Sequence, residues 1–183
     1  MPAARRRAFT LIETALLLCL VGVLLAVAIP TFVRTLRTSK VSEASRQLEL
    51  MYRHAAAYYA MPQQTESGKR LRCLPEGAGP APAQPSVEPV EVDFAHAETP
   101  GSATWRALEY QPGEPIRYRY TLIPTPAGCG APSPQGSSET ILTLRAEGDL
   151  DGDGTMSLFE RSASAGDGEL SPHPLLVVQD RVE

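Results

Sequence analysis

The chain has 183 residues, with 17 Lys and Arg against 21 Asp and Glu and a formal net charge of −4. This length allows one modest domain plus a membrane segment. No lysine or arginine cluster outside the first eight residues indicates a nucleic-acid footprint, so the composition argues against a nucleic-acid partner.

The N-terminal segment predicts a membrane span. Arg5, Arg6 and Arg7 come first, and the twenty residues between Glu13 and Arg34 carry no charge. At about 1.5 Å per residue these span about 30 Å, the hydrocarbon thickness of a bilayer. The positive-inside bias then places the N-terminus in the cytoplasm. The sequence therefore predicts a single-pass inner-membrane protein whose C-terminal part is periplasmic.

Three interpretations of this segment compete. A cleaved secretory signal would end at the small residues Ala26 and Ala28. A lipoprotein signal ending at Cys19 is disfavoured, because Leu18 stands where a small residue is required. A retained helix would instead lose only a short leader before the apolar run. Glu13 favours retention, because a carboxylate near the bilayer costs a few kcal/mol unless a cation pairs with it.

The sequence FTLIE at residues 9–13, after a basic leader and before about twenty apolar residues, resembles a type IV prepilin. The similarity extends to AIP at residues 28–30. It implies cleavage between Ala8 and Phe9 by a prepilin peptidase and N-methylation of Phe9. It also implies that Glu13 meets the α-amine of Phe9 on a neighbouring subunit. The family usually has glycine at the position of Ala8.

This resemblance divides the chain into four parts. Residues 1–8 form the leader, 9–33 the transmembrane and filament-core half of a long helix, and 34–60 its amphipathic half. Residues 61–183 form a loop-rich globular part. An apolar stripe supports the amphipathic half, since it recurs at steps of three and four through Val41, Ala44, Leu48, Met51, Ala55 and Tyr58.

The polar remainder predicts loops followed by strands. Residues 61–90 are rich in Pro and Gly and indicate a surface loop with little regular structure. Residues 116–122 and 140–145 alternate between apolar and polar side chains, and residues 175–178 suggest a last strand. The expected fold is α+β, with the long N-terminal helix packed on a small antiparallel sheet. If this part is exported, Cys73 and Cys129 form a disulfide; the alternative is two free thiols.

The segment DLDGDGTMSLFE at residues 149–160 matches the spacing of a calcium loop. Calcium takes six to eight oxygen ligands. The expected ligands are Asp149, Asp151, Asp153, Thr155, Ser157 and Glu160. The flanks do not predict an EF-hand, so we expect a structural calcium loop between strands; the alternative is a solvated Asp- and Gly-rich turn. Some pseudopilins of type II secretion carry a structural calcium, and the resemblance supports this hypothesis.

No nucleophile elbow, phosphate loop or metal-like histidine spacing indicates an enzyme. The sequence therefore predicts a structural subunit of a type IV pilus or a type II secretion pseudopilus. Its expected partners are other pilin subunits, the prepilin peptidase and the inner-membrane assembly platform. The alternative is a secreted soluble calcium-binding module cleaved after Ala28.

Overall fold

The computed structural model describes residues 11–65, 68–129, 140–166, 168–174 and 176–179, with the backbone alone over residues 33–40. Two compact units divide the chain, Met1–Ser39 and Lys40–Glu183. Helix α1 (Leu11–Ala60) belongs to both, and its 50 residues include Pro30. Each unit is described by itself.

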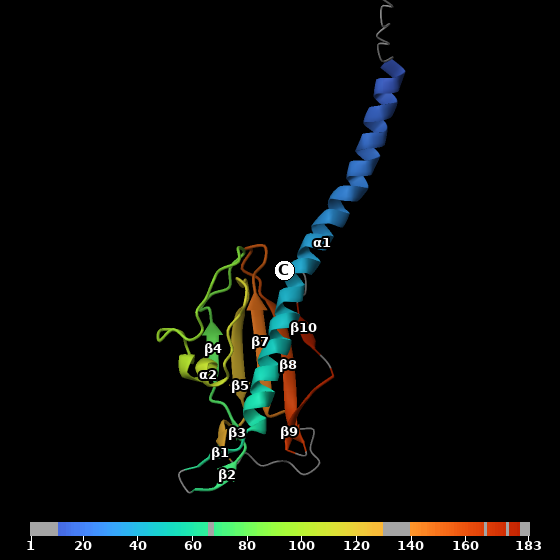
Figure 1. Ribbon diagram of the computed structural model, residues 1–183. Coiled ribbons are helices and arrows are strands. Elements are labelled where there is room, and N and C mark those ends of the chain that lie inside the picture. The colour runs from blue at the N-terminus through green and yellow to red at the C-terminus, as the bar shows by residue number, and fades with distance from the viewer. Residues whose placement is uncertain (1–10, 66–67, 130–139, 167, 175, 180–183) are drawn as a thin grey trace, which may run out of the picture. The chain divides into compact units, whose positions relative to one another are not determined.

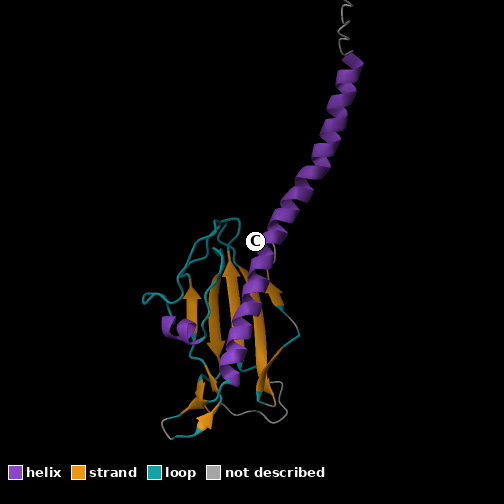
Figure 2. Ribbon diagram, in the orientation of Figure 1, coloured by secondary structure: helices purple, strands orange, loops and turns teal. Residues whose placement is uncertain are grey.

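The second unit is built on an antiparallel sheet (Figures 1 and 2). Its strands run in the order β10-β8-β7-β5-β4, and β9 also pairs with β8. The bounds are β4 Ala78–Ala81, β5 Arg119–Pro124, β7 Leu142–Gly148, β8 Ser157–Gly166, β9 Glu169–Pro172 and β10 Val177–Gln179. Strands β9 and β10 share one edge of β8, because residues 163–166 pair with β9 and residues 158–160 with β10.

Shorter elements complete the unit. Strands β1 (Gln63–Gln64) and β2 (Arg70–Leu71) form a hairpin just after α1, and β3 (Cys73–Leu74) pairs with β6 (Gly128–Cys129). The short helix α2 spans Ser102–Ala107. The expectation of little regular structure over residues 61–90 therefore overlooked four short strands.

The later part of α1 packs on one face of the sheet, as Figure 1 shows. The buried side chains of this part recur at helical spacing: Val41, Ala44, Leu48, Met51, Ala55 and Tyr59. The predicted stripe is thus confirmed, except that Tyr59 and not Tyr58 is its last buried member. Strand β7 alternates strictly between buried and half-buried residues, as expected for a sheet with one covered face. The predicted α+β fold is confirmed.

One glycine permits the close approach of β4 to β5. Gly79 has φ of +95°, and a Cβ there would lie 2.3 Å from the carbonyl oxygen of Tyr120. The register of the two strands shifts at this point, between Ala78 and Ala81. Any side chain at Gly79 would push the edge strand away from its neighbour.

Candidate functional site

The first described feature of functional interest is the apolar part of α1. Residues Leu11–Phe32 form a 22-residue stretch that is long and apolar enough to cross a membrane. All of its side chains are exposed, including Leu11 at 86% and Ile12 at 73%. Large apolar side chains do not remain in water over such a length without a partner. A cleaved signal sequence would share this length and composition, so the helix alone does not identify its role.

Glu13 lies in the first turn of α1 and is exposed. A negative side chain at this end of a helix interacts favourably with the helix dipole. The predicted cleavage and methylation residues, Ala8 and Phe9, lie outside the described residues.

The acidic loop connects two adjacent strands, β7 and β8, as expected from the sequence. Carboxylate oxygens of Asp149, Asp151 and Asp153 all lie within 4.8 Å of one another. The two oxygens of Asp149 accept hydrogen bonds from the backbone N–H groups of Gly152 (2.7 Å) and Gly154 (3.0 Å). The loop therefore curls around Asp149, and its three carboxylates form an exposed group that could bind a metal ion.

The other expected ligands are placed differently. Glu160 lies on β8, directly opposite Arg145 of β7, and its carboxylate accepts hydrogen bonds from Arg145 Nε (3.2 Å) and Nη2 (2.9 Å). Ser157 is fully buried, and its hydroxyl donates to the carbonyl of Gly148 at 2.9 Å. Thr155 is exposed, and its N–H donates to Asp153 at 2.7 Å. The structure thus brings the three aspartates together but does not bring Glu160 to them.

A buried carboxylate, Glu43, joins α1 to β5 and was missed by the sequence analysis. Its Oε1 accepts from the N–H of Arg117 at 2.8 Å and from the hydroxyl of Tyr120 at 3.4 Å. Its Oε2 accepts from Arg117 Nη1 at 3.3 Å. Burial, followed by the negative charge of Glu43, raises the pKa of Tyr120 well above its usual value of 10.0.

Two more polar residues of α1 follow Glu43 at helical spacing. Gln47 Oε1 accepts from the Tyr110 hydroxyl at 3.1 Å, and His54 Nδ1 donates to the Leu108 carbonyl at 2.8 Å. The recurrence of Glu43, Gln47 and His54 beside the apolar stripe was the signal available in the sequence. These contacts fix the later part of α1 to the segment that precedes β5.

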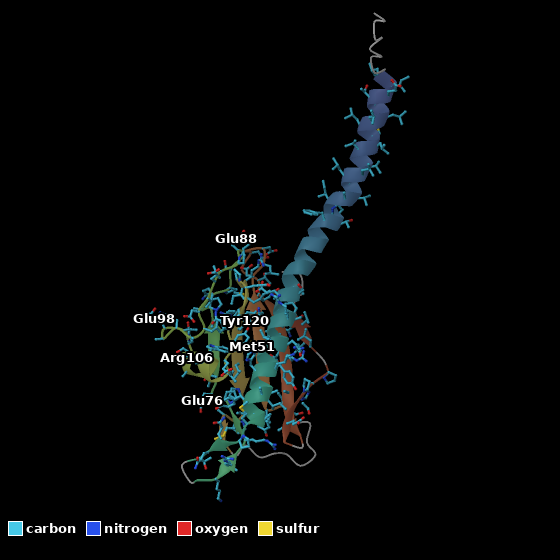
Figure 3. The ribbon with its side chains drawn as sticks, viewed as in Figure 1. Met51, Glu76, Glu88, Glu98, Arg106 and Tyr120 are labelled. Atoms are coloured by element: carbon cyan, nitrogen blue, oxygen red, sulfur yellow. A yellow bond between two sulfur atoms is a disulfide. The ribbon has the colours of Figure 1, made fainter. Side chains whose placement is uncertain are left out.

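A second set of contacts fixes α1 to β8 and β9. Arg161 of β8 pairs with Glu49 at 2.8 Å and lies 5.2 Å from the centre of the Tyr52 ring. The Tyr52 hydroxyl donates to the carbonyl of Leu170 at 2.6 Å. Figure 3 shows the side chains of α1 and the sheet meeting in this unit, with Met51 and Tyr120 labelled between the helix and the strands.

The disulfide expected from the sequence is present. Cys73 and Cys129 stand opposite each other in β3 and β6, with an S–S distance of 2.04 Å. Cys19 is the free cysteine of the described part and is exposed on the apolar part of α1. A disulfide of this kind is typical of an exported domain.

Together, the exposed apolar helix and the amphipathic helix on an antiparallel sheet define a pilin-like α+β architecture. Comparison with known proteins agrees with this class. The chain is 38% identical over 56 residues to the type IV major pilin protein PilA of Myxococcus xanthus (strain DK1622). The match covers 31% of this chain and 26% of that relative, so the chain spans about a quarter of the pilin it matches. No protein-family model and no solved structure matches the chain.

Proposed function

We propose that the protein is a structural, non-enzymatic subunit of a type IV pilus or a type II secretion pseudopilus. The observation that carries this proposal is the exposed apolar helix Leu11–Phe32, which continues without interruption into the helix that packs on the sheet. Such a helix first anchors a subunit in a bilayer and then packs among copies of itself, since both surroundings satisfy its apolar side chains. The similarity to a major pilin supports the same conclusion.

The proposed path begins in the inner membrane, with the unit Lys40–Glu183 in the periplasm. A prepilin peptidase removes residues 1–8 between Ala8 and Phe9, and Phe9 is N-methylated. Glu13 then pairs with the α-amine of Phe9 on a neighbouring subunit, which removes the cost of placing a carboxylate in an apolar environment. An inner-membrane assembly platform adds the subunit to the filament.

The acidic loop has a proposed structural role. Asp149, Asp151 and Asp153 hold a calcium ion, because hard carboxylate oxygens gathered within 4.8 Å suit this cation. Bound calcium would remove the repulsion among the three carboxylates and fix the turn between β7 and β8. The loop between strands supports the proposal, whereas the pairing of Glu160 with Arg145 argues that other oxygens complete the coordination.

The mature N-terminus tests the proposed function directly. The full-length protein is expressed in a bacterium that has a pilus system, and its intact mass and N-terminal peptide are measured. A mature chain that begins at N-methylated Phe9 supports the pilin subunit. A chain that begins at Ile29 supports the secreted module and overturns the proposal.

Glu13 provides a second test. Glu13→Ala and Glu13→Gln should both leave membrane insertion intact and reduce incorporation into filaments, because each removes the charge. Thr14→Ala is the matched control: Thr14 lies in the same turn and its hydroxyl donates to the Leu11 carbonyl at 3.0 Å. Normal incorporation of both Glu13 variants would exclude the proposed role of this carboxylate.

A further inference from the structure

The described part of the unit Lys40–Glu183 has two groups of exposed large apolar side chains, one close in the chain to lysine and arginine and the other close to glutamate. Five such residues are exposed among those that the structure describes in this unit: Met61, Leu71, Val87, Val90 and Val177. Four of them fall in two groups, one basic and one acidic. An apolar centre with a charged rim is the usual composition of a protein docking surface.

The first group, here called the basic end, consists of Met61, Lys69, Arg70, Leu71 and Arg72. Met61 is 65% exposed and Leu71 37% exposed, and the three cations close to Leu71 in the chain are exposed as well. None of the three takes part in an ion pair with another described residue. The sequence analysis overlooked this short basic run, which lies in and beside strand β2 of the β1 and β2 hairpin.

The second group, here called the acidic end, consists of Val87, Glu88, Val90, Glu91, Asp151 and Asp153. Val87 and Val90 are 39% and 38% exposed. Residue 87 also meets the acidic loop, since a Cβ at Gly152 would lie 3.4 Å from Val87 Cγ2. Glu88 and Glu91 directly follow the two valines in the chain, and Asp151 and Asp153 flank Gly152. The described residues hold no ion pair to any of these exposed carboxylates.

These two surfaces lie at opposite ends of the unit. Arg117 links the acidic end to the beginning of the sheet-packed part of α1. Its Nε donates to the Val87 carbonyl at 3.3 Å, and its backbone N–H donates to Glu43. The basic end follows Ala60, the last residue of α1. Glu43 and Ala60 are 60 − 43 = 17 residues apart, so the helix separates the two ends by about 25 Å. Figure 1 shows β1 and β2 at the lower end of the unit, and Figure 3 shows Glu88 at the upper end.

We infer that the basic end of one copy docks on the acidic end of a second copy. Rims of opposite charge attract each other and the apolar side chains between them can pack together, whereas two ends of like charge would repel. Because the two surfaces are different, the contact is head-to-tail, and such a contact leaves a free surface at each end for a further copy. The inference rests on the proposed filament function and specifies which surfaces of the periplasmic unit meet.

Photo-crosslinking of the full-length protein in its membrane tests the contact. The variant Leu71→p-benzoylphenylalanine should give a crosslinked dimer on irradiation, with the adduct in the peptide that contains residues 87–91. The matched control is Ala103→p-benzoylphenylalanine, because Ala103 is exposed on α2 and belongs to neither end. An adduct elsewhere on a second copy, an adduct with another protein, or the absence of a dimer would overturn the inference.

Charge exchange gives an independent measurement. Arg70→Glu with Arg72→Glu should lower the yield of the crosslinked dimer at least about tenfold, because like charges then face each other. Adding Glu88→Lys and Glu91→Lys should restore the yield to within about twofold, and these changes leave the three loop aspartates intact. Failure of this rescue would refute the pairing of the two ends. The mature N-terminus of the same sample reports separately on the proposed function. A failure of the docking inference can therefore be distinguished from a failure of the proposed function.

Discussion

Removal of the buried carboxylate of Glu43 should strongly destabilise the unit Lys40–Glu183. In Glu43→Ala the Arg117 N–H and the Tyr120 hydroxyl lose their acceptor, and each such buried group costs about 1–3 kcal/mol. The Arg117 guanidinium also loses its partner, and breaking a buried pair costs about 3–5 kcal/mol in all. A domain of this kind has only about 5–15 kcal/mol of stability, so the loss would be a large fraction.

Urea unfolding of the full-length protein in a non-ionic detergent measures this cost. Trp105 is the single tryptophan of the chain, is fully buried and packs against Phe94, so its fluorescence reports on the core of this unit. Glu43→Gln should cost less, about 1–2 kcal/mol, because its amide oxygen can still accept from Arg117.

The matched control is Arg53→Ala. Arg53 pairs with Glu49 across one turn of the same helix but is 71% exposed, so the expected cost is about 0.3–0.5 kcal/mol. If Glu43→Ala changed the free energy of unfolding by less than about 1 kcal/mol, the buried network would not hold α1 to the sheet as argued.

Three further predictions use the same fluorescence signal, a calcium titration and tyrosinate absorbance. Gly148→Ala places a Cβ 2.6 Å from the ring of Tyr118, so we expect a loss of about 1–3 kcal/mol; an unchanged midpoint would contradict the packing described for this ring. Asp151→Asn should weaken calorimetric calcium binding, whereas Glu160→Gln should leave it unchanged because Arg145 engages that carboxylate; equal losses would show that Glu160 is a ligand. Burial raises the pKa of Tyr118 to about 12, above the unfolded value of 10.0, so its contribution to stability is complete below pH 10 and is lost as the pH rises through 12. Tyrosinate absorbance of the buried tyrosines should therefore rise together with unfolding, and ionisation in the folded state near pH 10 would refute this.

Local sequence patterns were enough to predict the buried stripe of α1 and the position of the acidic loop. The stripe from Val41 to Ala55 depends on helical periodicity alone, and these side chains are buried as expected. The position of Asp149 and its neighbours between two strands followed from the alternating pattern of residues 140–145. Both features are set by residues close to each other in the chain.

Features that depend on pairing between distant residues could not be derived from the sequence. Motif spacing assigned Glu160 to the calcium loop, but the register of β7 and β8 places it opposite Arg145. Helical spacing places Glu43 beside the apolar stripe, but only its position over β5, 74 residues in the chain from Arg117, makes it a buried acceptor. The strands β1 to β4 contain few residues each, so no periodicity could develop within them.

The bond between Cys73 and Cys129 also affects what proteolysis can do to the protein. Strand β4, helix α2 and most of the acidic end lie between these cysteines, including the exposed stretch around Glu98. A protease that cuts this stretch leaves both fragments covalently joined, so the nicked chain keeps its full mass plus one water until a reductant separates the pieces. The protein could therefore be cleaved there without losing any part of itself.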